Sequence, residues 1–159
     1  MASARDEMRR RLLDRSLDRA PLRWRLRLRS PAGEPREVRL DEDDDDGGAI
    51  TVVAFWSRYC PPSRAELGDL DGIADRLAQR GGVRFIGVTD EADGDDVAAF
   101  LEAEGHTFPT YLDPERDARN AFDNRATPSY VVLDRDGRIR FEGRSADDIL
   151  RQVAALGTS

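Results

Sequence analysis

The chain has 159 residues, of which 39% are hydrophobic and 36% charged, and its net charge is −7. This length suits one domain with an added arm, and the clustered apolar runs exclude a disordered chain. The longest apolar stretch, residues 50–56, is too short to cross a bilayer, and residues 1–20 lack the apolar core of a secretory signal. The single cysteine excludes an internal disulfide and any multi-cysteine zinc or iron–sulfur site. We therefore expect either a cytosolic protein or a fragment of a longer one.

The charges are unevenly distributed along the chain. Residues 1–40 carry 12 Arg and 6 acidic residues, whereas residues 41–159 carry 13 Arg and 26 acidic residues. The acidic body argues against nucleic acid as a partner, because phosphate binding needs a basic surface. A run of six acidic residues at 41–46 lacks the glycine and the glutamate that an EF-hand loop requires. We predict a solvated connection there and no metal site.

The N-terminal residues predict a helical arm followed by a β-hairpin. A thin apolar stripe over residues 4–19 predicts a charged helix, so we assign residues 1–20 to an arm or linker and residues 21–159 to the domain. From residue 22 to residue 29, apolar side chains alternate strictly with arginine, which is the period of a half-buried strand. The alternation returns over residues 37–40 after a turn rich in Pro and Gly, and this predicts the second strand of the hairpin.

The rest of the chain alternates predicted strands with predicted helices. A continuous β-rich apolar run predicts a strand buried on both faces at 50–56, and Pro61 opens a helix that runs to about Arg80, before Gly81 and Gly82. The later predictions are a strand at 83–88, a helix at 95–104, an extended segment at 106–112, a short helix at 114–122, a hairpin at 129–133 and 138–143, and a last helix capped by Ser145. This order predicts an α/β domain with a central mixed β-sheet flanked by helices.

Cys60 is the candidate nucleophile. It follows a buried strand and begins a helix, where free N–H groups and partial positive charge stabilise a thiolate and lower its pKa. The two prolines that follow keep the sulfur at the edge of the predicted sheet. The alternative is a small apolar residue that closes the end of the strand, because free cysteines are often buried and inert.

The segment from Val53 to Leu67 resembles the active-site segment of TlpA/ResA-type thioredoxin-like proteins, within the AhpC/TSA and Redoxin-like superfamily. The sequences of those proteins typically contain, in this order, an apolar strand, Phe-Trp, Trp-Cys-x-x-Cys and a helix that begins Arg-x-Glu. Residues 126–139 resemble the cis-proline strand and hairpin of this family, and residues 85–88 and 108–114 follow its order and spacing. The resemblance covers about residues 22–156. It implies a thioredoxin-like fold with an N-terminal β-hairpin, and no bound cofactor.

The resemblance also implies a substrate-binding surface around the thiol. In this family, a cis peptide bond before the proline matching Pro128 faces the reactive cysteine, which leaves the backbone of Thr127 open to an extended substrate. The aromatic residues beside the thiol are expected to form part of the same surface. The resemblance places substrate binding at Trp56, Tyr59, Pro61, Thr127 and Pro128.

Two positions depart from the family pattern. Ser63 stands where the family has its second cysteine, so a mixed disulfide on Cys60 is released only by an outside thiol. We predict that Ser63 donates a hydrogen bond to the thiolate, and three interpretations of this serine stay open: a natural monothiol protein, a replaced cysteine, or a decayed interaction module. Ala54 stands where the family has a polar or acidic residue. Glu66 is therefore a candidate proton relay, with a solvated helix acid as the alternative.

Together these features predict a thiol–disulfide oxidoreductase or its monothiol variant, whose partners are thiol- or disulfide-bearing proteins or small thiols. The alternatives are a redox-inactive binding module and a one-cysteine peroxidase, whose motif Ser57 fits and Val53 does not. His106 is predicted to be an exposed loop residue rather than a general base. TlpA-like proteins usually work outside the cytoplasm, which would make this chain an excised domain.

Overall fold

The computed structural model of the chain describes residues 4–6, 25–39, 49–124 and 126–157. The predicted N-terminal arm, apart from residues 4–6, and the acidic run at 41–46 lie outside the described residues. Among the described helices, none has the length and the apolar character needed to cross a membrane.

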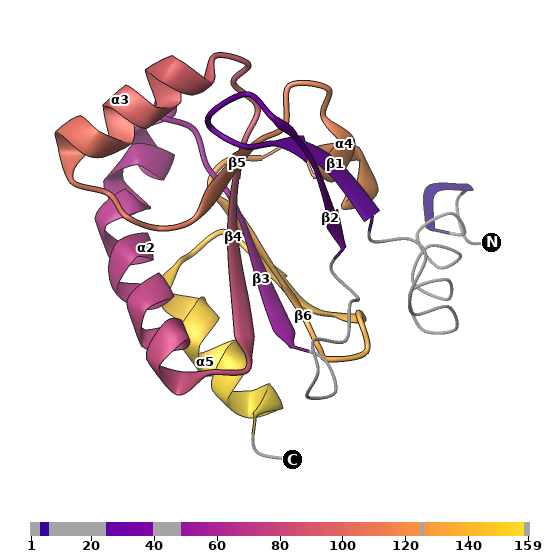
Figure 1. Cartoon of the computed structure of the whole chain (residues 1–159). Helices are drawn as coiled ribbons and strands as arrows, with labels where there is room; N and C mark the ends of the chain where they lie inside the picture. The colour runs from indigo at the N-terminus through magenta and orange to yellow at the C-terminus, as the bar shows by residue number, and fades with distance from the viewer. Residues whose placement is uncertain (1–3, 7–24, 40–48, 125, 158–159) are drawn as a thin grey trace.

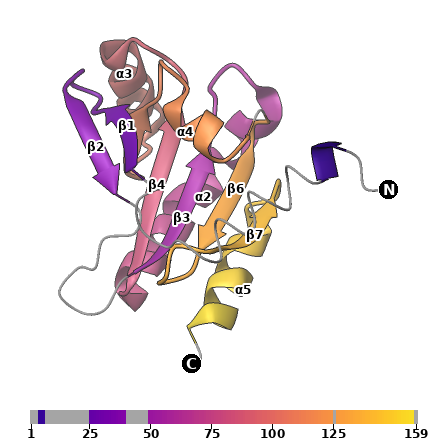
Figure 2. The same ribbon diagram turned by 90° about the vertical axis from the view of Figure 1, so that its right-hand side faces the viewer.

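Seven described strands form one mixed sheet. They are β1 (Arg25–Arg29), β2 (Pro35–Arg39), β3 (Ile50–Phe55), β4 (Val83–Thr89), β5 (Thr110–Leu112), β6 (Ser129–Leu133) and β7 (Ile139–Gly143). Their order in the sheet is β2-β1-β5-β4-β3-β6-β7 (Figure 1 and Figure 2). Strand β3 runs parallel to β4, and β4 runs parallel to β5, whereas the other neighbouring pairs are antiparallel. Every residue of the central strand β3 is buried, as the continuous apolar run predicts.

Helices cover both faces of the sheet and enclose two hydrophobic clusters. Helices α2 (Pro61–Arg80), α3 (Gly94–Glu104) and α5 (Asp147–Leu156) lie on one face, over the larger cluster (Figure 1). The short helix α4 (Asp117–Ala121) lies on the other face, on the side of the β1–β2 hairpin, over the smaller cluster. The order of strands and helices after the arm is the predicted one. Because apolar side chains point to both faces, the central strands are fixed in register from both sides.

The predicted helix ends are confirmed for α2 and wrong for α5. Helix α2 ends at Arg80, and Gly81 follows with φ 75°, a left-handed conformation that glycine adopts without a steric penalty. Ser145 does not cap α5 through its hydroxyl, because the helix begins after Ala146 without a side-chain cap from that residue, and Ser145 supplies only its carbonyl, to the N–H of Asp148 at 3.3 Å. The Ala146 N–H donates instead to a carboxylate oxygen of Glu66 on α2, at 3.3 Å.

The turn of the β1–β2 hairpin rests against the start of α3 at Gly94. A Cβ atom on Gly94 would lie 1.8 Å from the Pro31 carbonyl oxygen, a backbone atom that cannot rotate away. We expect Gly94→Ala to lower the free energy of unfolding by about 1–3 kcal/mol, because the hairpin turn must move off the helix. Gly72→Ala on α2 is the matched control, since its Cβ would meet open space and helix propensity favours alanine by about 0.5–1 kcal/mol. Urea denaturation of both variants should give changes of opposite sign, and equal changes would contradict this packing.

Candidate active site

Cys60 lies at the junction between the central strand and helix α2. The chain leaves β3 through Trp56, whose N–H donates to the Val88 carbonyl at 3.0 Å, and turns so that the Cys60 N–H meets the Ser57 carbonyl at 3.3 Å. Cys60 occupies the N-cap position of α2 in an extended conformation, and prolines fill the first two helical positions. Prolines cost no hydrogen bond there, because the first N–H groups of a helix have no intrahelical acceptor. The sulfur is therefore held, partly exposed, at the edge of the sheet.

The groups around the sulfur favour its ionised form. The backbone N–H of Ser63 makes the largest contribution to lowering the pKa of the Cys60 thiol, followed by a hydrogen bond from Thr127 and by the positive charge of Arg144. Partial desolvation acts in the opposite direction and does not reverse the shift. The thiol donates to the Thr127 carbonyl oxygen at 3.3 Å, a hydrogen bond that only the protonated sulfur can make. The site therefore fits a thiol that ionises at lower pH than a free cysteine.

Ser63 contacts this site through both its side chain and its backbone. Its side chain is buried, and its hydroxyl oxygen accepts the Ser57 N–H at 2.9 Å. The Ser57 hydroxyl accepts the Tyr59 N–H at 3.2 Å, so two serine side chains hold the turn before the cysteine. The donor that Ser63 offers to the sulfur is its backbone N–H, whereas its hydroxyl orders the loop.

The peptide bond between Thr127 and Pro128 is cis, as the resemblance implied. Its surroundings contain a residue that the sequence reasoning missed. Arg144 donates from Nη2 to the Thr127 carbonyl at 3.2 Å and from Nε to the Pro128 carbonyl at 3.3 Å. The Thr127 carbonyl is thus shared between Cys60 and Arg144 rather than left open. The predicted β-hairpin was the available signal, because its register pairs Tyr130 with Gly143 and so brings residue 144 next to the cis-proline loop.

The expected substrate-binding aromatics separate into a buried and an exposed residue. Trp56 is wholly buried, its indole N–H donates to Thr110 Oγ1 at 2.9 Å, and its ring packs against Phe100 and Phe108. It is a core residue and cannot contact a substrate, which corrects the prediction for this position. Tyr59 is 73% exposed beside the thiol. Pro61 is also exposed, whereas Pro128 is buried and Thr127 is partly exposed.

Glu66 is neither a solvated acid nor a free one. One carboxylate oxygen accepts the hydroxyl of Tyr130 on β6, and the other accepts the Ala146 N–H at the start of α5. Burial first, and then the bond to Glu66, raise the pKa of Tyr130 well above its ordinary value, so the phenol stays the donor at any physiological pH. The alternative of a solvated helix acid is therefore excluded, and Glu66 joins three elements under the active-site end of α2.

His106 also differs from its prediction as an exposed loop residue. Its side chain is 13% exposed, and Nδ1 lies 2.7 Å from a carboxylate oxygen of Asp71 on α2. The other oxygen of Asp71 accepts the N–H groups of Thr107 and Phe108 at 2.8 and 3.1 Å. Sequence spacing could not reveal this arrangement, because the two partners lie 35 positions apart. Asp71 and His106 anchor the segment that leads into β5.

A sequence model of the AhpC/TSA family matches residues 26–142, which contain both Cys60 and the cis-proline. The chain belongs to the AhpC/TSA family. In sequence, this AhpC/TSA chain is 28% identical over 120 residues to the thiol-disulfide oxidoreductase ResA of Halalkalibacterium halodurans, and the match covers 75% of this chain and 65% of the relative. The chain therefore matches slightly less than two thirds of that protein's length. This similarity confirms the expected relationship to ResA-type proteins.

Solved structures confirm the thioredoxin-like fold of this AhpC/TSA chain. StoA from Bacillus subtilis superimposes with a TM-score of 0.67 at 20% identity, over 84% of this chain and 98% of StoA. A secreted Mycobacterium tuberculosis disulfide oxidoreductase, described as homologous to Escherichia coli DsbE, gives 0.65 at 23% identity, over 84% and 98% of the two chains. A DsbE-like thiol:disulfide interchange protein from Chlorobium tepidum gives 0.67 at 22% identity, over 87% and 95%. At these identities, the likeness concerns the fold alone.

Proposed function

We propose that this chain carries out thiol–disulfide exchange through a single cysteine, forming mixed disulfides at Cys60 that an outside thiol releases. The observation that carries the proposal is the set of groups around the sulfur: the Ser63 N–H, the side chain of Thr127 and the cation of Arg144 all favour the thiolate, which is the nucleophile in disulfide exchange. The names of the relatives support the same reaction class, since ResA is described as a thiol-disulfide oxidoreductase. Thiol- or disulfide-bearing proteins and small thiols are its substrates.

The roles in this reaction follow from the contacts. Cys60 attacks one sulfur of a disulfide, and the thiolate of the other half leaves, so no proton or electron is lost. The Ser63 N–H and Arg144 stabilise the negative charge on Cys60 before the attack and again when the outside thiol displaces it. Tyr59 and Pro61 form the exposed surface beside the sulfur, and Thr127 is partly exposed next to them. Both carboxylate oxygens of Glu66 already accept hydrogen bonds, from Tyr130 and from Ala146. Glu66 therefore remains a candidate proton relay only by way of these two partners.

The alkylation rate of Cys60 as a function of pH tests the ionisation of the thiol. Because the folded site lowers the pKa of Cys60, native protein should react with iodoacetamide at pH values where an unfolded cysteine, with a pKa of about 8.5, is still protonated. The rate should rise as pH increases through the lowered pKa and then level off. Peptide mass spectrometry on native and denatured protein between about pH 4 and pH 9 gives both profiles.

Arg144→Gln tests how much the charge of Arg144 contributes to this pH profile. Loss of the cation should move the native profile towards higher pH, because the thiolate loses an attractive charge. Arg140→Gln, on an exposed arginine of β7 that pairs with Asp134, removes the same charge from another place and should leave the profile unchanged. A native rate no faster than the unfolded rate at every pH would favour the alternative of a redox-inactive binding module.

A further inference from the structure

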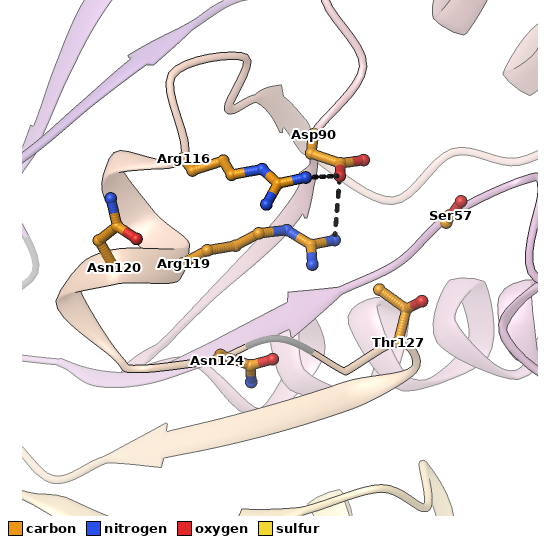
Figure 3. Close-up of a pocket in the computed structure, with 7 residues that line it drawn as sticks. All are labelled: Ser57, Asp90, Arg116, Arg119, Asn120, Asn124 and Thr127. Carbon is orange, nitrogen blue, oxygen red and sulfur yellow. Dashed lines mark ion pairs between the residues drawn. The ribbon is translucent and has the colours of Figure 1, made fainter.

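A polar cavity of about 370 Å³ lies between α4, the end of β4 and the cis-proline loop (Figure 3). Ser57 and Thr127, which both contact Cys60, belong to its lining, and Arg116 and Arg119 extend into it from the segment around α4. Asp90, which follows β4, is the acidic residue in its lining. The volume lies within the range of small-molecule sites, about 300–1,000 Å³, and exceeds what one inorganic ion needs.

Arg119 is a buried cation whose hydrogen bonds are incomplete. Its side chain is only 10% exposed, and its Nε atom has no hydrogen-bond partner. Its Nη2 atom lies 3.8 Å from Asp90, which is an ion pair too long for a hydrogen bond, and its Cζ atom lies 5.9 Å from the centre of the Phe55 ring. A buried guanidinium without full pairing is costly, so an anion in the cavity would complete its contacts.

The backbone of α4 fixes the position of this cation. The carboxylate of Asp113, which is wholly buried, accepts the N–H groups of Ala118 and Arg119 at 3.2 and 3.1 Å. Arg116, which precedes α4, brings its Nη2 atom within 4.0 Å of the same Asp90 oxygen and keeps its side chain 68% exposed. One carboxylate is thus shared by two guanidinium groups, and the lining keeps an excess positive charge in a protein whose net charge is −7.

The cavity is adjacent to the reactive sulfur. Ser57 accepts the Cys60 N–H at its carbonyl, and Thr127 accepts the Cys60 thiol at its carbonyl, both at 3.3 Å. Both residues also line the cavity, so two residues that contact Cys60 form part of its wall. Guanidinium groups favour carboxylates, which they bind through two parallel hydrogen bonds.

We propose that this cavity binds the carboxylate end of a small acidic thiol, as the free thiol or within a disulfide, and presents its sulfur to Cys60. The inference rests on the proposed function, and it names the outside thiol that the missing second cysteine requires. Cys60 thiolate attacks the disulfide between a protein and the small thiol, taking the small thiol and releasing the protein thiolate. A second small thiolate then displaces Cys60, which yields the small disulfide and regenerates the Cys60 thiolate.

Matched disulfide probes test the proposal through the rate at which Cys60 gains a mixed disulfide. Oxidised glutathione carries two carboxylates on each half, and 2-hydroxyethyl disulfide is neutral. We expect Arg119→Gln and Arg116→Gln to slow the reaction with oxidised glutathione about tenfold, and to leave the reaction with 2-hydroxyethyl disulfide unchanged. Asp90→Asn should accelerate the glutathione reaction, because it removes the carboxylate that competes for both arginines. Arg140→Gln controls for the loss of one positive charge elsewhere.

A binding measurement separates this proposal from the exchange reaction. S-methylglutathione keeps the carboxylates and has no reactive thiol, so calorimetry on the Cys60→Ser variant reports the cavity alone. We expect binding that Arg116→Gln weakens about tenfold; this exposed position keeps the test valid if Arg119→Gln fails to fold. Absence of binding, or a glutathione preference that no cavity variant changes, would overturn the cavity proposal. Failure of Cys60 to react with the neutral disulfide would instead overturn the proposed function.

Discussion

A cysteine placed at position 63 is expected to convert the chain from a protein that holds a captured thiol into one that releases it. Positions 60 and 63 lie one helical turn apart at the start of α2, so the new thiol attacks the mixed disulfide within the same molecule. We expect Ser63→Cys to shorten the lifetime of the 2-hydroxyethyl adduct on Cys60 at least about 100-fold, because the attack becomes intramolecular. Mass spectrometry after removal of excess disulfide would follow the loss of the adduct and the appearance of an internal disulfide.

Ser63→Ala is the matched control for this experiment. It also removes the serine hydroxyl but supplies no thiol, so the adduct should persist as in the original chain. Its folding stability should fall by about 1–3 kcal/mol, since the Ser57 N–H loses its acceptor. An adduct on Ser63→Cys that lasts as long as the one on Ser63→Ala would show that residue 63 does not face the captured sulfur.

Loss of the Glu66 carboxylate is expected to give a large change in stability. Its two oxygens bind the Tyr130 hydroxyl and the Ala146 N–H, both of which lie in buried residues. Glu66→Ala leaves both donors unpaired, and we expect the free energy of unfolding to fall by about 3–5 kcal/mol. Urea denaturation at pH 7 measures this change.

Glu66→Gln separates the shape of this side chain from its charge. The amide keeps one oxygen acceptor at nearly the same place, so it should cost clearly less than the alanine variant. If both variants unfolded with the same free energy as the original chain, the carboxylate would not hold the three elements together. The Cys60 alkylation profile of Glu66→Gln also tests the relay hypothesis, which requires the profile to change.

Local patterns predicted the elements, since each depends on residues close together in the sequence. The continuous apolar run before Cys60 specified a strand buried on both faces, and Gly81 specified the end of the long helix. The errors concern contacts between distant segments. Ser145 is an ordinary N-cap residue type, but the carboxylate that accepts the N–H group at the start of α5 comes from Glu66, 80 residues before Ala146. His106 is largely buried for a similar reason, because Asp71 on α2 contacts the loop residue that follows α3.

The centre of the candidate active site could be predicted from the sequence, but its surroundings could not. Cys60 and the cis-proline were found from the motif that each carries. Arg144 and Arg119 carry no motif, since each is one of 25 arginines in a chain without lysine, and only the fold brings them to the site. Trp56 was wrongly predicted to bind substrate. It is close to Cys60 in sequence, but that closeness does not decide whether the side chain faces the surface or the core, and it packs in the core.

From the strand order we infer the sequence in which the thiol acquires its environment during folding. The unit β3-α2-β4 is built from neighbouring segments, whereas β6 pairs with β3 across an interval that leads from Phe55 to Ser129. Closing such long intervals is slow compared with forming local contacts. The cis-proline loop and Arg144 both belong to the C-terminal part of the chain. The Ser63 N–H, which makes the largest contribution to the lowered pKa of Cys60, forms with α2, so we expect a partly folded chain to carry a thiol that is already more acidic than a free cysteine. The contributions of Thr127 and Arg144 are then added only when the C-terminal part docks.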